Sequence, residues 1–228
     1  MSAGEPFNPL DKKTLGLTVA RAMLESAAVQ LPIVAPFPGA GIYAIYYVGS
    51  EYAPYRIIAQ KNVKGRLSWP IYIGKAVPAG ARKGILKPVG NSTRMRPTDS
   101  QIAGPLFKRI LEHSESIAQA KSLSIKSFLC RYLTVDDIWI PLGESVLINE
   151  LRPIWNLVID GFGNHDPGSG RREQMKSSWD VLHPGRPWAA KLAANKRTET
   201  EILENLAEFV ARYPNQVNGD LERDEDSA

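Results

Sequence analysis

The sequence contains a single cysteine, Cys130, among 228 residues. One cysteine cannot form an internal disulfide, and it excludes a zinc site built mainly from cysteines. Cys130 alternates with other apolar residues in the strand-like stretch 127–133. We therefore expect it to be a small core residue rather than a nucleophile.

Long hydrophobic runs are also missing, because the longest, at 42–48, is far too short to span a bilayer. The N-terminus lacks the basic start and apolar core of a signal peptide, so we expect a cytoplasmic protein. A hydrophobic content of 43% and a charged content of 23% are ordinary for a globular protein. The length favours a single domain, 1–216, and we expect the remaining residues, 217–228, to form a disordered acidic tail.

Acidic residues are scarce between Arg56 and His113. Twelve lysines and arginines there face only Asp99 and Glu112, which gives this stretch a net charge of +10. The last twelve residues instead hold five acids and one arginine. A basic segment suits a polyanionic partner, because Lys and Arg displace condensed counterions from phosphates. An ordinary solvated basic surface would have the same composition.

The hydrophobic pattern predicts an α+β fold with a small central sheet, mixed or antiparallel, flanked by helices. We expect strands at 41–48, 55–59, 71–73 and 127–135. Helices are predicted at 14–28, 105–120, 142–151, 187–195 and 198–212. Two stretches rich in glycine and basic residues, 77–104 and 161–172, are typical of functional loops.

Two tyrosines and an Arg/His pair are candidates for chemistry. Gly41-Ile42-Tyr43 and Tyr72-Ile73-Gly74 each place a tyrosine on a predicted strand. Arg109 and His113 lie four residues apart, on one face of a predicted helix. Arginine can hold a phosphate oxygen through two hydrogen bonds, and histidine can exchange a proton near neutral pH. Taken alone, each pair also fits a purely structural role.

Glu144 is an unusual residue because it shares a helix face with Leu147, Ile148 and Leu151. A carboxylate that faces a core needs a positive partner. A divalent cation fits, since Mg²⁺ often takes only one or two protein carboxylates. A structural arginine such as Arg109 would serve equally well.

In combination these residues resemble the GIY-YIG nuclease superfamily. The two tyrosine motifs match the strands that give the superfamily its name, and further matches are the helix pair Arg109 and His113, the metal-binding Glu144, and Asn156 in Pro153-Ile154-Trp155-Asn156. The similar string Tyr46-Tyr47-Val48-Gly49 lies in the same predicted strand as Tyr43, so it is not the second motif.

Tyr43 and Tyr72 are 29 residues apart, which is more than is usual in the superfamily. This spacing, together with the stretches 7–13 and 179–188, is similar to the type II restriction endonuclease branch. The resemblance implies a three-stranded GIY-YIG sheet with inserted loops that read DNA. It also implies hydrolysis of double-stranded DNA with one divalent metal, Mg²⁺ or Mn²⁺, at a GC-rich palindrome such as CCGCGG.

The resemblance also implies a role for each residue. Glu144 would hold the metal, and Arg109 would clamp a phosphate oxygen. Tyr43, tuned by His113 or Lys75, would deprotonate the attacking water. Tyr72 and Asn156 would position the phosphate and the glutamate, while Lys75 could instead contact a phosphate.

Basic residues in the two long loops and just after them are the candidates for DNA contacts. Arginine and lysine read guanine edges in the major groove, although many contact only phosphates. The candidates are Arg82, Lys83, Arg94, Arg96, Arg171, Arg172 and Arg186. By contrast, we expect His183 to brace a loop and Trp188 to be a core aromatic.

Cleavage of both strands of a palindrome by one active site per chain calls for a two-fold homodimer. A restriction enzyme also implies a companion DNA methyltransferase that protects host DNA. Three alternatives remain at this point. The first is a repair or homing-type nuclease of the same superfamily, the second is a non-catalytic DNA-binding module, and the third is a basic structural protein in which Glu144 only forms a salt bridge. Retention of Tyr43, Arg109 and Glu144 disfavours the second.

Overall fold

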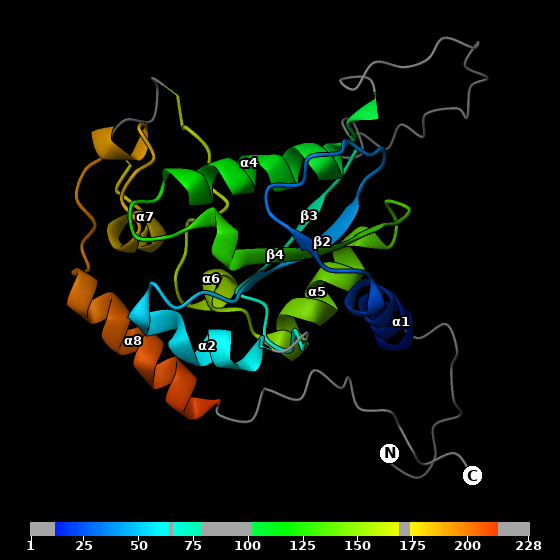
Figure 1. Cartoon of the computed structure of the whole chain (residues 1–228), viewed down its shortest axis with the longest axis horizontal. Helices are drawn as coiled ribbons and strands as arrows, with labels where there is room; N and C mark the ends of the chain where they lie inside the picture. The colour runs from blue at the N-terminus through cyan, green and yellow to red at the C-terminus, as the bar shows by residue number, and fades with distance from the viewer. Residues whose placement is uncertain (1–11, 64–65, 79–101, 169–173, 214–228) are drawn as a thin grey trace.

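The computed structural model describes residues 12–63, 66–78, 102–168 and 174–213. In this part of the chain a four-stranded antiparallel sheet lies between two layers of helices (Figure 1). Its strands are β1 (Val29–Gln30), β2 (Gly41–Tyr47), β3 (Tyr72–Ala76) and β4 (Phe128–Thr134), in the order β1-β4-β2-β3. The α+β prediction is confirmed. The sheet has four strands rather than three because Val29 and Gln30 pair with β4.

The central strand β2 is buried on both faces. Tyr43 and the other odd-numbered residues of β2 enter one core, and Ile42 and the other even-numbered residues enter a second. This is the alternation expected of a strand covered on both sides. The first core lies against α4 (Pro105–Gln119), and the second lies against α1 (Lys12–Glu25) and α5 (Ile140–Leu151). Neighbouring side chains of β2 therefore face opposite helix layers.

Two glycines let α1 and α5 approach each other closely. A Cβ atom on Gly16 would lie 2.5 Å from Val146, and one on Gly143 would lie 2.7 Å from Val19. Both distances are shorter than a normal carbon–carbon contact. The small residues therefore determine how α5 sits on the sheet, and with it the position of Glu144.

Two predicted elements were wrong. The segment 55–59 is not a strand but part of a 3-10 turn, η1 (Ala53–Tyr55), and the helix α2 (Arg56–Lys61). Its buried residues Tyr55, Ile58, Ala59 and Asn62 have helical spacing. The predicted helix 187–195 is reduced to the turn η5 (Ala189–Lys191), after which Ala193 bridges to Met175.

The other predicted helices are present with slightly shifted ends. The helix α5 ends at Leu151, where Arg152 takes a left-handed conformation before Pro153. The last helix, α8 (Glu199–Arg212), begins with a capping box between Thr198 and Glu201. The remaining elements are η3 (Ile125–Ser127), α6 (Ile154–Leu157) and α7 (Ser178–Leu182). None of the described helices has the length and apolarity needed to cross a membrane. The predicted tail 217–228 lies outside the described residues.

Candidate active site

The two motif glycines make room for atoms of neighbouring strands. Gly74 lies opposite Tyr43 in the β2–β3 ladder. A Cβ atom at Gly74 would be 2.4 Å from the Tyr43 hydroxyl oxygen, and one at Gly41 would be 1.9 Å from the carbonyl oxygen of Leu133. Any larger residue at 74 would push the Tyr43 ring away. The glycine thus allows this ring to lie across β3.

The hydroxyl of Tyr43 and Nε2 of His113 share a hydrogen bond of 2.6 Å in the protein interior. Burial raises the pKa of Tyr43 well above its ordinary value, and the nearby Tyr72 raises it further. Burial, followed by the positive charge of Arg109, lowers the pKa of His113 well below its ordinary value. Both groups are therefore neutral at pH 7, and one proton lies between them.

Arg109 lies on the same face of α4 and is held by three partners. Its Nη1 donates to Glu112 at 3.0 Å and also contacts Nε2 of His165, and its Nη2 donates to the carbonyl oxygen of Gly163 at 3.0 Å. The side chain keeps 21% of its surface exposed. The guanidinium is thus oriented and still open to an anionic ligand.

Tyr72 interacts electrostatically with both the arginine and the glutamate. Burial raises the pKa of its hydroxyl, the positive charge of Arg109 lowers it, and the negative charge of Glu144 raises it. Its ring centre is 6.1 Å from that of Tyr43. The two tyrosines, Arg109 and Glu144 therefore belong to one electrostatic cluster.

The partner of Glu144 is Lys75, not Arg109. The Lys75 ammonium lies 2.5 Å from Oε2 of the glutamate, and the two side chains are 39% and 18% exposed. In the sheet register Lys75 pairs with Ile42, so it shares a face with α5 and lies on the opposite face from Tyr43. The structure thus places Lys75 beside the acid and gives it no hydrogen bond to Tyr43 among the described contacts.

The cluster forms because β3 is an edge strand. Tyr43, Tyr72, Arg109 and His113 approach this edge from the side of α4, and the pair of Lys75 and Glu144 approaches it from the side of α5. No further strand covers the edge in the described part of the chain. Groups from both faces of the sheet therefore meet at this edge, where Tyr43 and His113 are buried while Arg109, Lys75 and Glu144 are partly exposed.

A family model described as the Eco29kI GIY-YIG domain matches residues 35–210. The match spans most of the chain and contains all of the residues that meet at the edge of β3. This chain belongs to the Eco29kI GIY-YIG family. A search of curated proteins found no match. Membership of the Eco29kI family supports a nuclease of the restriction endonuclease type, with DNA as its substrate.

GIY-YIG nucleases generally use divalent metals. Among the described residues, no group of three or more His, Cys, Asp or Glu side chains could hold such an ion. A site with one carboxylate, completed by water and phosphate oxygens, still suits a hard cation such as Mg²⁺. Glu144 fits this site, with one of its two oxygens paired to Lys75.

Asn156, the late asparagine of the GIY-YIG motif, is bound to the backbone of β3. Its Oδ1 accepts from the N–H of Ile73 at 2.9 Å, and its Nδ2 donates to the carbonyl oxygen of Ile73 at 2.8 Å. The amide thereby takes the place of a missing neighbouring strand. It positions Tyr72 and Lys75 through their strand rather than by contact with Glu144.

Arg186 does not match the prediction of a DNA contact. Its side chain is 1% exposed, and its Nε donates to Asp180 at 2.8 Å. A guanidinium paired in the interior cannot reach a base or a phosphate. The other predicted DNA contacts lie outside the described residues: Arg82, Lys83, Arg94, Arg96, Arg171 and Arg172.

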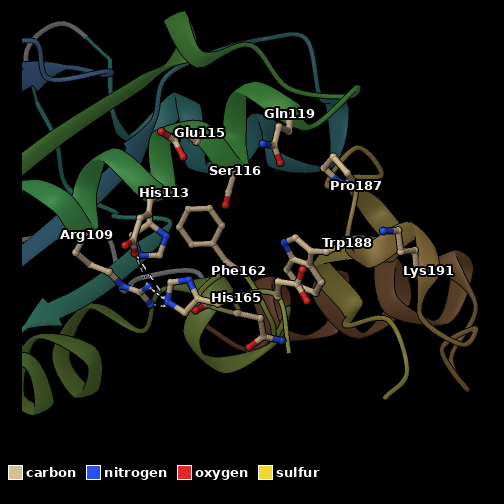
Figure 2. A pocket seen from close by; sticks show the side chains of 14 residues that line it. Arg109, His113, Glu115, Ser116, Gln119, Phe162, His165, Pro187, Trp188 and Lys191 are labelled. Atoms are coloured by element: carbon tan, nitrogen blue, oxygen red, sulfur yellow. Dashed lines mark hydrogen bonds and ion pairs between the residues drawn. The ribbon is translucent and has the colours of Figure 1, made fainter. Parts of the chain in front are cut away.

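A cavity of about 380 Å³ adjoins the cluster. It extends from Arg109 along α4, past Ser116 and Gln119, to Trp188 and Lys191 (Figure 2). Trp188 is half-buried at this cavity, so it is not the core aromatic that was predicted.

His183 braces a loop as predicted. The ring is buried, with hydrogen bonds of 2.6 Å to the Tyr55 hydroxyl and 2.7 Å to Ser122.

Sequence reasoning missed three contacts of Arg109. Glu112 lies three residues further along α4, a spacing that could have revealed it. His165 and Gly163 are more than 50 residues away in a loop, and no local pattern connects them to the arginine. Figure 2 shows His165 reaching toward Arg109 from this loop.

Proposed function

We propose that this chain is a type II restriction endonuclease. It hydrolyses double-stranded DNA at a specific site with the help of one divalent cation, Mg²⁺ or Mn²⁺, and acts in the cytoplasm. Its site is a GC-rich palindrome such as CCGCGG. The proposal depends on one observation: the pair of Tyr43 and His113, the guanidinium of Arg109 and the carboxylate of Glu144 all lie around Tyr72 at the edge of β3.

Tyr43 and His113 supply the path for the proton. In the tautomer of neutral His113 that carries its proton on Nδ1, Nε2 accepts a hydrogen bond from the Tyr43 hydroxyl, and the mechanism uses this tautomer. As the attacking water loses a proton to the Tyr43 oxygen, the original Tyr43 proton moves to His113. This transfer requires no phenolate at rest, which agrees with the raised pKa of Tyr43.

Arg109 binds a non-bridging oxygen of the scissile phosphate. The negative charge on this oxygen grows in the transition state, where a fixed cation is most effective. The three contacts of Arg109 orient it before DNA arrives. The metal, held by Glu144, would stabilise charge on the phosphate and the leaving oxygen.

Recognition and symmetry complete the proposal. The basic residues of the loops 77–104 and 161–172 contact DNA, whereas the buried Arg186 does not. The enzyme cuts as a two-fold homodimer, because each chain carries one site. A DNA methyltransferase protects the host genome without forming a stable complex with the enzyme.

The decisive experiment is digestion of mixed-sequence plasmid DNA with and without Mg²⁺. We expect discrete fragments with the wild type and none with Glu144→Gln, which keeps the shape of the side chain and removes its charge. Glu150→Gln is the matched control, because Glu150 is exposed on the same helix. It should cut normally.

Other results would favour one of the alternative functions. Cutting restricted to branched DNA would favour a repair nuclease, and binding without any cleavage would favour a non-catalytic module. Light scattering after gel filtration tests the dimer, and a monomer in the presence of cognate DNA would contradict it.

A further inference from the structure

The buried ion pair of Arg186 and Asp180 has no role in the proposed mechanism. The two side chains are 1% and 2% exposed and lie 2.8 Å apart. Burial of two charges is costly, so such a pair persists only when hydrogen bonds satisfy its remaining atoms. Those hydrogen bonds show what the pair holds in place.

Arg186 donates to three carbonyl oxygens of a single loop. Its Nη2 donates to Gly161 at 3.0 Å, and its Nη1 donates to Phe162 and Asn164, both at 3.2 Å. Its guanidinium also lies 4.5 Å from the ring centre of Trp179 and 4.6 Å from that of Trp188. The planar group is thus fixed between two indoles, with its donors directed at the loop 161–164.

The fourth carbonyl of this loop, that of Gly163, accepts a hydrogen bond from Arg109. The carbonyl oxygen of Gly163 accepts from Nη2 of Arg109 at 3.0 Å, between the residues that Arg186 holds. The ring of Phe162 stacks on His113 at 4.5 Å, with 20° between the ring planes. In Figure 2 the ring of Phe162 lies below α4, between His113 and Trp188. One short loop therefore joins the buried arginine to two residues of the site.

We propose that Arg186 is a positioning residue for Arg109, and that it acts through the backbone of the loop 161–164. This inference rests on the proposed nuclease function. Arg186 touches neither DNA nor the reacting atoms. It determines where the Gly163 carbonyl lies and, through that carbonyl, the direction of the catalytic guanidinium.

Arg186→Lys is the suitable variant. It keeps a positive charge beside Asp180, so the buried carboxylate is not left unpaired. A single ammonium group cannot reach three carbonyls and one carboxylate in the planar arrangement of a guanidinium. The matched control is Arg197→Lys, because Arg197 binds Asp160 and Ser178 at a half-exposed position and has no described hydrogen bond to the loop 161–164 or to Arg109.

The experiment measures single-turnover cleavage and, with Ca²⁺ in place of Mg²⁺, the Kd for DNA. We expect Arg186→Lys to lower the cleavage rate by about 10- to 100-fold and to leave the Kd within about twofold. On an Arg109→Lys background the same change should cost less than about threefold, because the group it positions is already altered. Arg197→Lys should change neither quantity.

Three results would overturn the inference. A weaker Kd and a shallower salt dependence at an unchanged rate would indicate a DNA contact. A lower Tm with a normal rate at a temperature well below it would indicate a purely structural role. A rate loss of about threefold or more on the Arg109→Lys background would show that the two residues act separately.

A second measurement does not depend on cleavage. Hydrogen exchange of the backbone amides at 161–165 should be faster in Arg186→Lys than in the wild type, because the loop loses its anchor. Unchanged exchange would refute the anchoring role even for a chain that cuts no DNA. Failure of the wild type to cut would instead refute the proposed function alone.

A substitution in the loop itself tests the same inference and leaves the buried ion pair of Arg186 and Asp180 unchanged. A Cβ atom on Gly163 would lie 3.1 Å from the Tyr72 hydroxyl and 3.4 Å from Nη2 of Arg109. Gly163→Ala should therefore lower the cleavage rate by about tenfold at an unchanged Kd. A normal rate would contradict the idea that the position of this loop determines that of Arg109.

Discussion

At the scale of single residues, environment gives the tyrosines of β2 different tasks. Tyr43 and Tyr46 are both fully buried on the same strand, yet they face opposite helix layers. The hydroxyl of Tyr43 binds His113, whereas that of Tyr46 has no hydrogen-bond partner among the described residues. A comparison of the same substitution at Tyr43 and at Tyr46 therefore tests what the phenol of Tyr43 does.

Tyr43→Phe should lower the single-turnover cleavage rate by about 100- to 10,000-fold, because the proton path is lost. The variant should also lose about 1–3 kcal/mol of stability, since the buried nitrogen of His113 is left without its partner. Tyr46→Phe is the control and should retain full activity. Equal rates for Tyr43→Phe and the wild type would remove Tyr43 from the mechanism.

In the proposed function, the ammonium of Lys75 and the metal would compete for the carboxylate of Glu144. Lys75→Met should strengthen Mn²⁺ binding to the DNA-free protein by about two- to fivefold, because the competing ion pair is partly exposed and therefore worth little. Titration calorimetry measures this affinity. Lys126→Met, at an exposed position in η3, should not change it. Weaker binding in Lys75→Met would mean that the lysine helps to build the metal site.

At the scale of elements, β3 depends on an asparagine because no described strand lies on its outer side. The side chain of Asn156 pairs with both backbone groups of Ile73. It thereby occupies positions where another strand would otherwise bind. The same edge carries Tyr72 and Lys75. Its backbone groups therefore need hydrogen-bond partners, while the edge also has to remain open to substrate.

Asn156→Ala should lower the free energy of unfolding by about 1–3 kcal/mol, because two backbone groups lose their partner. Asn156→Asp should not restore stability, since its second oxygen would face the carbonyl oxygen of Ile73. Urea denaturation measures both variants against Asn149→Ala, which changes an exposed asparagine of α5. A wild-type midpoint for Asn156→Ala would contradict this role.

At the scale of the whole molecule, histidines couple stability to pH. The chain has three histidines, and two of them, His113 and His183, are buried. Burial, with a contribution from Arg186, lowers the pKa of His183 to about 3, and burial with nearby positive charge lowers that of His113. In the unfolded chain both titrate near ~6.5. Below that pH the unfolded state binds more protons than the folded state, so acidification favours unfolding.

The free energy of unfolding should fall by about 2–3 kcal/mol between pH ~7.5 and pH ~5.5, because each of the two buried histidines contributes roughly 1.4 kcal/mol over this whole interval. Urea denaturation at several pH values measures this slope. His183→Gln should halve it, whereas His165→Gln should not, because His165 is exposed. A slope that His183→Gln leaves unchanged would show that His183 does not cause the pH dependence.

The sequence alone determined the strand of Tyr43, the helix of Arg109 and His113, and the inward direction of Glu144. Each of these follows from local alternation or helical spacing, which act over a few residues. The same patterns gave two wrong predictions. The apolar run 55–59 was predicted as a strand and is largely helical, and 187–195 was predicted as a helix and forms only a short turn.

Tertiary structure alone decided which groups became partners. Lys75 pairs with Glu144 because the register of β2 and β3 places the lysine under α5. Asn156 binds Ile73 because β3 is an edge, and Arg186 turns inward because three carbonyls and an aspartate surround it. These contacts join residues whose separation along the chain follows neither helical nor strand periodicity. They arise from packing, which no local pattern in the sequence records.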